Sequence, residues 1–232
     1  MKTEYRTRNA GFTLVELLVA MAVSLVVGAA IYTVYLSQTR TQVTQEVYLQ
    51  LQEGLRAAMM IMENDIRTAG TDPTGTAGAR IITADTAELR FTRDITGGNI
   101  NGRDSYDGNI GDPIEDVRFA INPDGHLGME LGGAVDDDEL VPILDNVDVL
   151  NFVYLDRNEN VLATPVGNTN NIRQVQVTIV ARSDQSNRGL LGRHTDTLSY
   201  ENQQGAVILA PQNDNVRRLR LSTTITCRNL VN

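Results

Sequence analysis

The stretch that decides the fold is residues 12–36, which read FTLVELLVAMAVSLVVGAAIYTVYL. After Glu16, no charged residue occurs before Arg40, which leaves 23 uncharged positions. A helix needs about 20 predominantly apolar residues to cross a bilayer. Basic residues precede the run, so the amino terminus is expected to stay in the cytoplasm while the rest is exported. The stretch therefore predicts a membrane-spanning helix.

Two kinds of export segment share these features. An ordinary secretory signal also has a basic start, an apolar stretch and a small-residue cleavage site, which Gly28-Ala29-Ala30 would supply. Glu16 separates the two, because a charge inside an apolar segment costs about 2.5–3.5 kcal/mol on insertion scales. An ordinary signal gains nothing from such a residue, so Glu16 favours a segment that is kept and used.

The hexapeptide Gly11-Phe12-Thr13-Leu14-Val15-Glu16, preceded by a short basic leader, resembles the class III signal of type IV pilins and pseudopilins. In that family a leader ends in Gly, and the mature chain begins with Phe and carries Glu at its fifth position. The resemblance implies that a prepilin peptidase cuts between Gly11 and Phe12 and methylates the new amine of Phe12.

The same resemblance implies a contact between Glu16 and the Phe12 amine of a neighbouring subunit. Opposite charges attract strongly in a low-dielectric setting, and a buried charge left alone is penalised. The pairing would thus check subunit register during assembly. The alternative is that Glu16 reaches the membrane interface and pairs with nothing.

Residues 1–11 would be the cleaved leader. They carry Lys2, Arg6 and Arg8 against Glu4, a net charge of +2. Removing them takes the formal charge of the chain from −9 to −9 − 2 = −11.

The helical pattern continues past the apolar run. Apolar residues recur at three- and four-residue spacing through Val43, Val47, Leu51, Leu55, Met59, Met62, Ile66 and Ala69. Proline is absent before Pro73, and Gly70 is the expected C-cap. We expect one helix over residues 12–69, about 87 Å long at 1.5 Å per residue. Residues 12–36 would lie in a membrane or filament core, and residues 37–70 would form the amphipathic half.

The end of this helix, LQEGLRAAMMIMENDIRTAG at residues 51–70, resembles that of PilW-type minor pilins. Pseudopilins of the J type, which serve type II secretion, share a similar ending.

Residues 71–232 are expected to form a β-rich head packed on the amphipathic half, an α+β, pilin-like arrangement. Short runs rich in β-branched and aromatic residues predict strands, at residues 81–82, 87–93, 117–121, 147–155, 172–181 and 219–227. Alternation within residues 175–181 suggests a sheet with one face on the helix. Residues 94–113 and 183–215 are polar and predict long surface loops, which often bind partners.

The sequence gives no sign of an enzyme. His126 and His194 have no ligand or nucleophile motif nearby. The single cysteine, Cys227, forbids an internal disulfide and is interpreted as a small apolar residue in the last strand. An acidic balance, with a pI near 4.7, argues against nucleic acid as a partner.

Calcium is the one cofactor that the sequence raises, and only as a weak candidate. Asp156, Asn158 and Asn160 have the alternate spacing of a calcium loop, but Val161 stands where such a loop needs Gly. The acidic run at residues 136–139 indicates a solvated loop. We therefore expect no cofactor.

The favoured function is a minor pilin that primes type IV pilus assembly, as a structural filament subunit. The resemblance implies three partners, namely the prepilin peptidase, other minor and major pilins, and the inner-membrane assembly platform. It also implies a single-pass inner-membrane protein with a periplasmic head, later part of a filament. Two alternatives stay open. They are a type II secretion minor pseudopilin and a membrane-anchored ligand-binding module.

Overall fold

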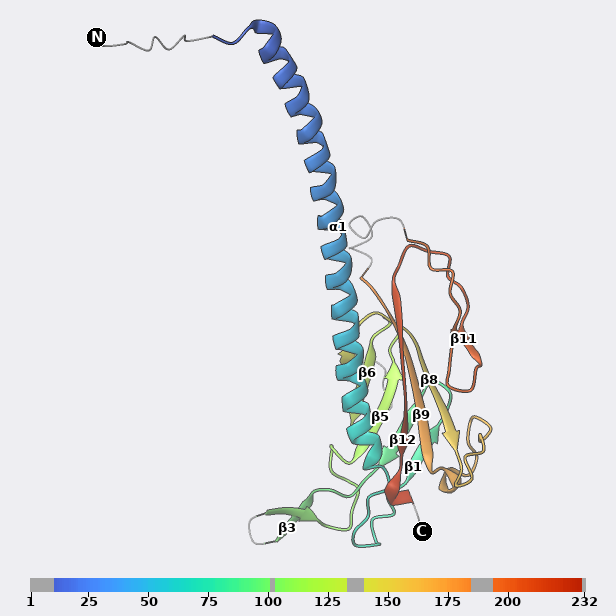
Figure 1. Cartoon of the computed structure of the whole chain (residues 1–232). Helices are drawn as coiled ribbons and strands as arrows, with labels where there is room; N and C mark the ends of the chain where they lie inside the picture. Colours follow the sequence, from blue (N-terminus) through green and yellow to red (C-terminus); the bar gives the residue numbers. More distant parts are fainter. Residues whose placement is uncertain (1–10, 101–102, 133–139, 185–193, 231–232) are drawn as a thin grey trace, which may run out of the picture.

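The computed structural model describes residues 11–100, 103–132, 140–184 and 194–230. Its first element is α1, a helix that runs unbroken over Leu14–Arg67, 54 residues. Figure 1 shows the first half of α1 projecting from the head and the second half lying against it. The two halves of this one helix therefore lie in different environments, the first apart from the head and the second packed against it.

The helix is shorter at each end than expected, and threonines set both limits. Thr13 is the N-cap, and Thr68, rather than Gly70, is the C-cap. The Thr68 hydroxyl donates to the carbonyl of Asp65 at 2.6 Å, and such local bonds compete with continued helix. Gly70 lies two residues beyond the cap at a φ of 75° and donates its N–H to the carbonyl of Thr92.

The head consists mainly of two antiparallel sheets. The larger has the order β1-β2-β5-β6-β7, with strands at Ile81–Ala84, Leu89–Thr92, Asp116–Ile121, Leu127–Leu131 and Val141–Leu144. The smaller has the order β12-β9-β8, with β8 at Val147–Leu155, β9 at Gln174–Arg182 and β12 at Arg218–Thr226. The α+β prediction, a long helix with a mainly antiparallel head, is confirmed, with two sheets in place of one.

Two hairpins and two 3-10 turns complete the head. The hairpins are β3–β4, Gly97–Ile100 with Arg103–Tyr106, and β10–β11, Tyr200–Glu201 with Val207–Leu209. The turns are η2 at Thr169–Asn171 and η4 at Arg228–Leu230. Both segments predicted as loops therefore contain a hairpin. The acidic run at residues 136–139 lies outside the described residues.

The core forms where the second half of α1 meets both sheets. The predicted apolar face is buried at Val47, Leu55, Met59, Met62, Ile66 and Ala69, whereas Leu51 is half-buried. The large fully buried side chains of the sheets are Phe91, Phe119, Phe152 and Tyr154. Burying a side chain of this size contributes about 1.5–3 kcal/mol, so this face holds the head on the helix.

The smaller sheet differs from expectation, because β9 is covered on both faces. Val180, Thr178 and Gln176, which alternate with the helix-facing residues, are also buried. The segment around β10–β11 covers them, with Gln204 Nε2 donating to Gln176 Oε1 at 2.9 Å. Part of the region predicted as a long polar surface loop therefore covers the outer face of the smaller sheet, and we call residues 194–217 the lid.

The arginines at the start of β12 pair mostly within the chain. Arg218, with a side chain 4% exposed, contacts the carboxylates of Asp148, Asp196 and Asp214 at 2.6–3.0 Å. The hydrogen bond with Asp214, outweighing burial, raises the pKa of Arg218 above its ordinary value. Arg220 donates to the carbonyl of Glu201. Arg218 and Arg220 of β12 thus connect the smaller sheet to the lid by ion pairs and a hydrogen bond.

Candidate functional site

The candidate site is the start of α1, where the chain changes from extended to helical. Thr13 has extended backbone angles, φ −81° and ψ 152°, and its Oγ1 accepts the N–H of Glu16 at 3.3 Å. Its carbonyl accepts the N–H of Leu17 at 3.1 Å. An N-cap threonine of this kind satisfies a backbone donor that the first turn leaves free.

The structure brings the predicted residues into one short segment. Gly11 and Phe12 lie in the extended stretch before the cap, and Phe12 is 84% exposed. Gly11 is exposed, and a Cβ added to it would meet no atom within 4 Å among the described residues. Glu16 lies in the first turn, where the positive end of the helix dipole favours a carboxylate. The Gly11–Phe12 bond is therefore open to approach from outside the chain.

Sequence reasoning missed the part played by Thr13. Thr13-Leu-Val-Glu16 has the Thr-x-x-Glu spacing of a capping box, a signal that was present in the sequence. The rest of the leader, with Lys2, Glu4, Arg6 and Arg8, lies outside the described residues.

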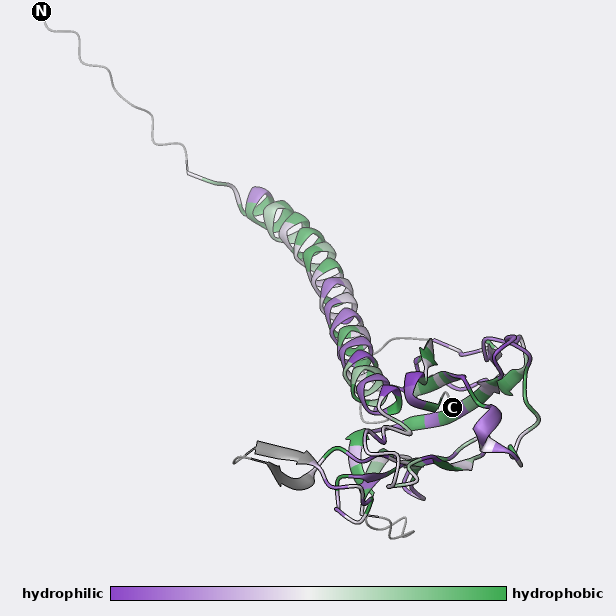
Figure 2. Cartoon of the chain, turned by 90° about the horizontal axis from the view of Figure 1, so that it is seen from below, coloured by the Kyte–Doolittle hydropathy of each residue, from purple (hydrophilic) through white to green (hydrophobic). Residues whose placement is uncertain are grey.

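The first half of α1 exposes its apolar side chains. Leu14, Leu17, Leu18, Leu25 and Ile31 are each more than half exposed, Leu25 at 73%. Among the described residues, α1 is the one helix long and apolar enough to span a membrane, judged by length and composition. Figure 2 shows this concentration of apolar residues on the projecting half.

One face of this projecting half carries a shallow apolar groove. Small residues, Ala20, Ser24 and Gly28, recur at four-residue intervals along it. Larger side chains such as Leu17 and Leu25 flank them. Small residues at this spacing allow another helix to approach closely in a membrane.

The weak calcium candidates form a turn. Asp156 Oδ1 accepts the N–H groups of Asn158 and Asn160 at 2.7 and 2.9 Å, and Oδ2 accepts Asn160 Nδ2 at 3.0 Å. These bonds, that of the Asn160 side chain first, lower the pKa of Asp156. Glu159 takes a φ of 63° within the turn. A cation would have to displace these donors from the carboxylate.

The two histidines lie apart from the start of α1. His126 Nδ1 is 2.7 Å from Asp145 Oδ1, a contact between two turns that the sequence does not reveal. His194 lies in the segment that precedes β10. Among the described residues no group of three or more His, Cys, Asp or Glu could hold a metal ion.

Comparison with known proteins agrees with this geometry. The type IV-like pilin TTHA1219 from Thermus thermophilus has a similar structure, with a TM-score of 0.51 over 78% of this chain and 97% of that one. At 14% identity the likeness concerns the fold alone. The family model of the prokaryotic N-terminal methylation motif matches residues 6–32. The chain thus has a pilin-like fold and carries the N-terminal methylation motif. No curated protein matches its sequence.

The matched motif covers the start of α1 and the residues that precede it. The methylation motif spans the last part of the leader, from Arg6, together with Gly11, Phe12, Glu16 and most of the exposed apolar half. By length and composition this segment can cross a membrane.

Proposed function

We propose that this chain is a minor pilin that helps to prime type IV pilus assembly. The observation that carries the proposal is the uncovered first half of α1, whose apolar side chains meet no part of the head. Exposed apolar surface of this extent needs a membrane or other helices to cover it. In a subunit that passes from a bilayer into a filament core, lipid covers this surface first and the helices of other subunits cover it afterwards.

Processing would prepare this helix for the filament. The peptidase cuts the exposed bond between Gly11 and Phe12 and methylates the new amine of Phe12. Glu16 then pairs with the amine of a neighbouring Phe12. The pair forms in an apolar, low-dielectric setting. There the two opposite charges attract strongly, and either charge without its partner would pay the full cost of burial.

A low-copy role fits the head better than that of the repeating subunit. A major pilin would be expected to close a loop near its carboxyl terminus with a disulfide, which needs two cysteines. This chain has one cysteine, Cys227, and it is buried. The helix ending at residues 51–70 points further toward the PilW type. The role needs no cofactor and no nucleic acid.

Before assembly, residues 12–36 would span the inner membrane with the head in the periplasm. The partners would be the prepilin peptidase, other minor and major pilins, and the assembly platform of the inner membrane. The small-residue groove around Ser24 is the face that fits a neighbouring helix most closely.

Deleting the gene and counting surface pili tests the role. We expect pili to be lost or sharply reduced and then restored by the wild-type gene, with exoprotein secretion unchanged. Normal pili combined with exoproteins retained in the periplasm would overturn the proposal and point to a type II secretion pseudopilin.

A further inference from the structure

The smaller sheet has an open edge along β12, its outermost strand. Just before β12, the carbonyl of Arg217 accepts the N–H of Ser183 at 2.8 Å. Just after it, the N–H of Cys227 donates to the carbonyl of Arg173 at 2.9 Å. The register between them is continuous, so the odd-numbered residues of β12 bond to β9. The backbone groups of the even-numbered residues point away from the sheet, because the two sets alternate along an antiparallel strand.

This outward row of backbone groups is unpaired. In the described part of the chain no hydrogen bond engages the backbone N–H or carbonyl groups of Arg218, Arg220, Ser222, Thr224 and Thr226. The row can also be reached from outside, since three of these residues are exposed and the other two are half-buried. Unpaired groups in a regular row are a template for another strand.

The other sheet edges of the described head are short or covered. Along β8, the N–H of Phe152 donates to the carbonyl of Thr86, and the carbonyl of Tyr154 accepts the N–H of Leu162. The edge strands β1 and β7 have four residues each, and β7 contains Pro142. By contrast, β12 has nine residues, no proline and no shift of register against β9. Proline, bulges and covering segments normally protect an edge, so their absence here favours a strand that pairs with a partner.

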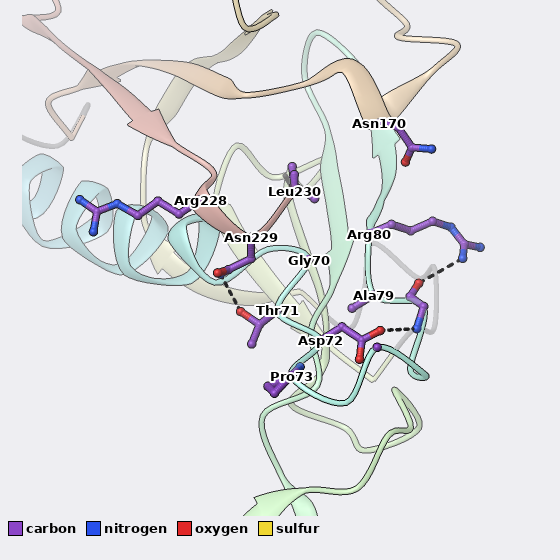
Figure 3. A pocket seen from close by; sticks show the side chains of 12 residues that line it. Gly70, Thr71, Asp72, Pro73, Ala79, Arg80, Asn170, Arg228, Asn229 and Leu230 are labelled. Carbon is purple, nitrogen blue, oxygen red and sulfur yellow. Dashed lines mark hydrogen bonds between the residues drawn. The ribbon is translucent and has the colours of Figure 1, made fainter. Parts of the chain in front are cut away.

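The open edge is held in place where β12 ends. Asn229 of η4 donates through Nδ2 to Thr71 Oγ1 at 2.8 Å, as Figure 3 shows, and to the carbonyl of Arg67 at 3.3 Å. With residues 70–80, η4 also lines a cleft of about 650 Å³. Residues 228–230 therefore turn toward the end of α1 and leave the edge uncovered. A strand that is already ordered loses little conformational freedom when a partner binds.

The side chains beside the edge indicate the chemistry of the partner. On the face toward α1, Leu219 and Leu221 are half-buried against the core, so apolar residues of an added strand would complete their cover. Residues 217–228, RRLRLSTTITCR, contain four arginines and no acidic residue, although the whole chain has a formal charge of −9. On the opposite face, Arg220 is exposed. Acidic residues on that face of the partner would complement this charge.

The direction of α1 disfavours a second copy of the chain as the partner. Antiparallel pairing of two β12 edges would reverse one copy, so the projecting halves of the two helices would point in opposite directions (Figure 1). One membrane would not receive both in the same orientation. We propose that the open edge of β12 binds an extended segment of another protein as an additional antiparallel strand, apolar toward α1 and acidic on its other face. This surface lies on the head and does not depend on a role in a pilus.

Fluorescence anisotropy with the full chain in detergent micelles tests the surface. The probe is a labelled peptide of alternating valine and glutamate that matches the nine residues of β12 in length. One control peptide carries N-methyl groups on its glutamates, which removes the N–H donors that face β12 and keeps the side chains. The other has lysine in place of glutamate. We expect saturable binding of the probe, at least roughly ten-fold tighter than either control.

Thr224→Pro and Thr224→Val form a matched pair of variants. Proline removes an outward N–H and leaves the bonds to β9, and it is tolerated at an edge position of this kind. Valine removes the hydroxyl, which donates to Gln203 Oε1 at 2.7 Å, but keeps the N–H. Thr224→Pro should weaken binding of the probe at least roughly ten-fold, and Thr224→Val less than about two-fold.

Several outcomes would overturn the proposal. They are no saturable binding, equal binding of either control peptide, and equal weakening by the two variants. A dimer of the chain in sedimentation experiments that Thr224→Pro abolishes would also overturn it, because the edge would then bind a second copy.

Discussion

At the first turn of α1, a carboxylate, a hydroxyl and the future amino terminus lie within five residues of one another. Thr13 caps the turn and Glu16 lies within it, while Phe12 is still extended. The account gives each group a different role, so Glu16 and Thr13 can be substituted one at a time and their effects measured separately.

Glu16→Ala tests the pairing between subunits. Cleavage and membrane anchoring should be intact, because the scissile bond and the apolar run are unchanged. Incorporation into the filament should be lost, because the Phe12 amine of the neighbour would have no partner in an apolar setting. Immunoblots of sheared filaments and of membranes measure the two outcomes. Glu16→Gln is the control for charge at constant size, and normal piliation of the Ala variant would refute the pairing.

Thr13→Val tests whether the N-cap keeps the scissile bond out of the helix. The carbonyl of Thr13 is the first that the helix engages, so the carbonyl of Gly11 stays outside its hydrogen bonds. Losing an N-cap costs about 1 kcal/mol, which corresponds to roughly five-fold slower processing if the helix then spreads toward Gly11. Cleavage rates with purified peptidase measure this.

Thr13→Ser should keep the normal rate of cleavage, since serine caps equally well. Thr33→Val is the matched control, because the Thr33 hydroxyl bonds to the carbonyl of Ala30 in mid-helix. Equal rates for Thr13→Val and the wild type would show that the cap does not control processing.

The residues of the site were predictable to the extent that they follow a local motif. Gly11, Phe12 and Glu16 were singled out by their resemblance to a processing motif and stay a prediction, whereas the capping role of Thr13 could have been inferred from its Thr-x-x-Glu spacing. The contact between His126 and Asp145 joins two turns, so it depends on strand register, which one sequence does not specify.

Among the elements, those with a clear period were predicted and those without one were missed. The helix follows from its apolar spacing, and β8 and β12 from their β-branched runs. The strand β6 contains Gly128, where a Cβ would lie 2.7 Å from the Cβ of Leu140. Its neighbour β7 contains Pro142, which cannot donate a hydrogen bond. Close packing in the tertiary structure stabilises both strands, and the local sequence of each strand contains no pattern that predicts it.

Gly70→Ala tests the joint between α1 and the head. Gly70 has a φ of 75°, and an added Cβ would lie 2.4 Å from Leu230 Cδ2. Backbone strain and overpacking together should lower the free energy of unfolding by about 2–4 kcal/mol, as measured by chemical denaturation.

Gly75→Ala separates the two causes. Gly75 has a φ of 69°, but a Cβ added there would have nothing within 4 Å, so only the strain applies. We expect a loss of about 1 kcal/mol there. If the two variants lost equal stability, the contact with Leu230 would not matter.

On the scale of the whole molecule, Cys227 reports whether the head is closed. Burial raises the pKa of its thiol to about 12. The folded state thus holds the proton more tightly, and this contribution to stability is fully present below the unfolded pKa and is lost as pH rises through about 12. At pH 8 a maleimide should label the native chain at least about 100-fold more slowly than the chain in urea. Rapid native labelling would contradict the burial of this residue.

The architecture divides one helix between two tasks. Its second half supplies the core of the head, through Leu55, Met62 and Ile66 among others. Its first half contributes nothing to that core and leaves its apolar surface exposed. The sequence predicted this division, but not the lid around β10–β11 or the cleft beside η4, because each joins segments far apart in the chain.

The amino terminus of the mature protein tests the central claim most directly. The chain is expressed with and without a prepilin peptidase, purified from membranes and analysed by mass spectrometry. With the peptidase, the account predicts a chain that begins at N-methylated Phe12, and without it a chain that retains its leader. A chain that stays uncut in the presence of the peptidase, or that is processed at Ala30, would contradict the account.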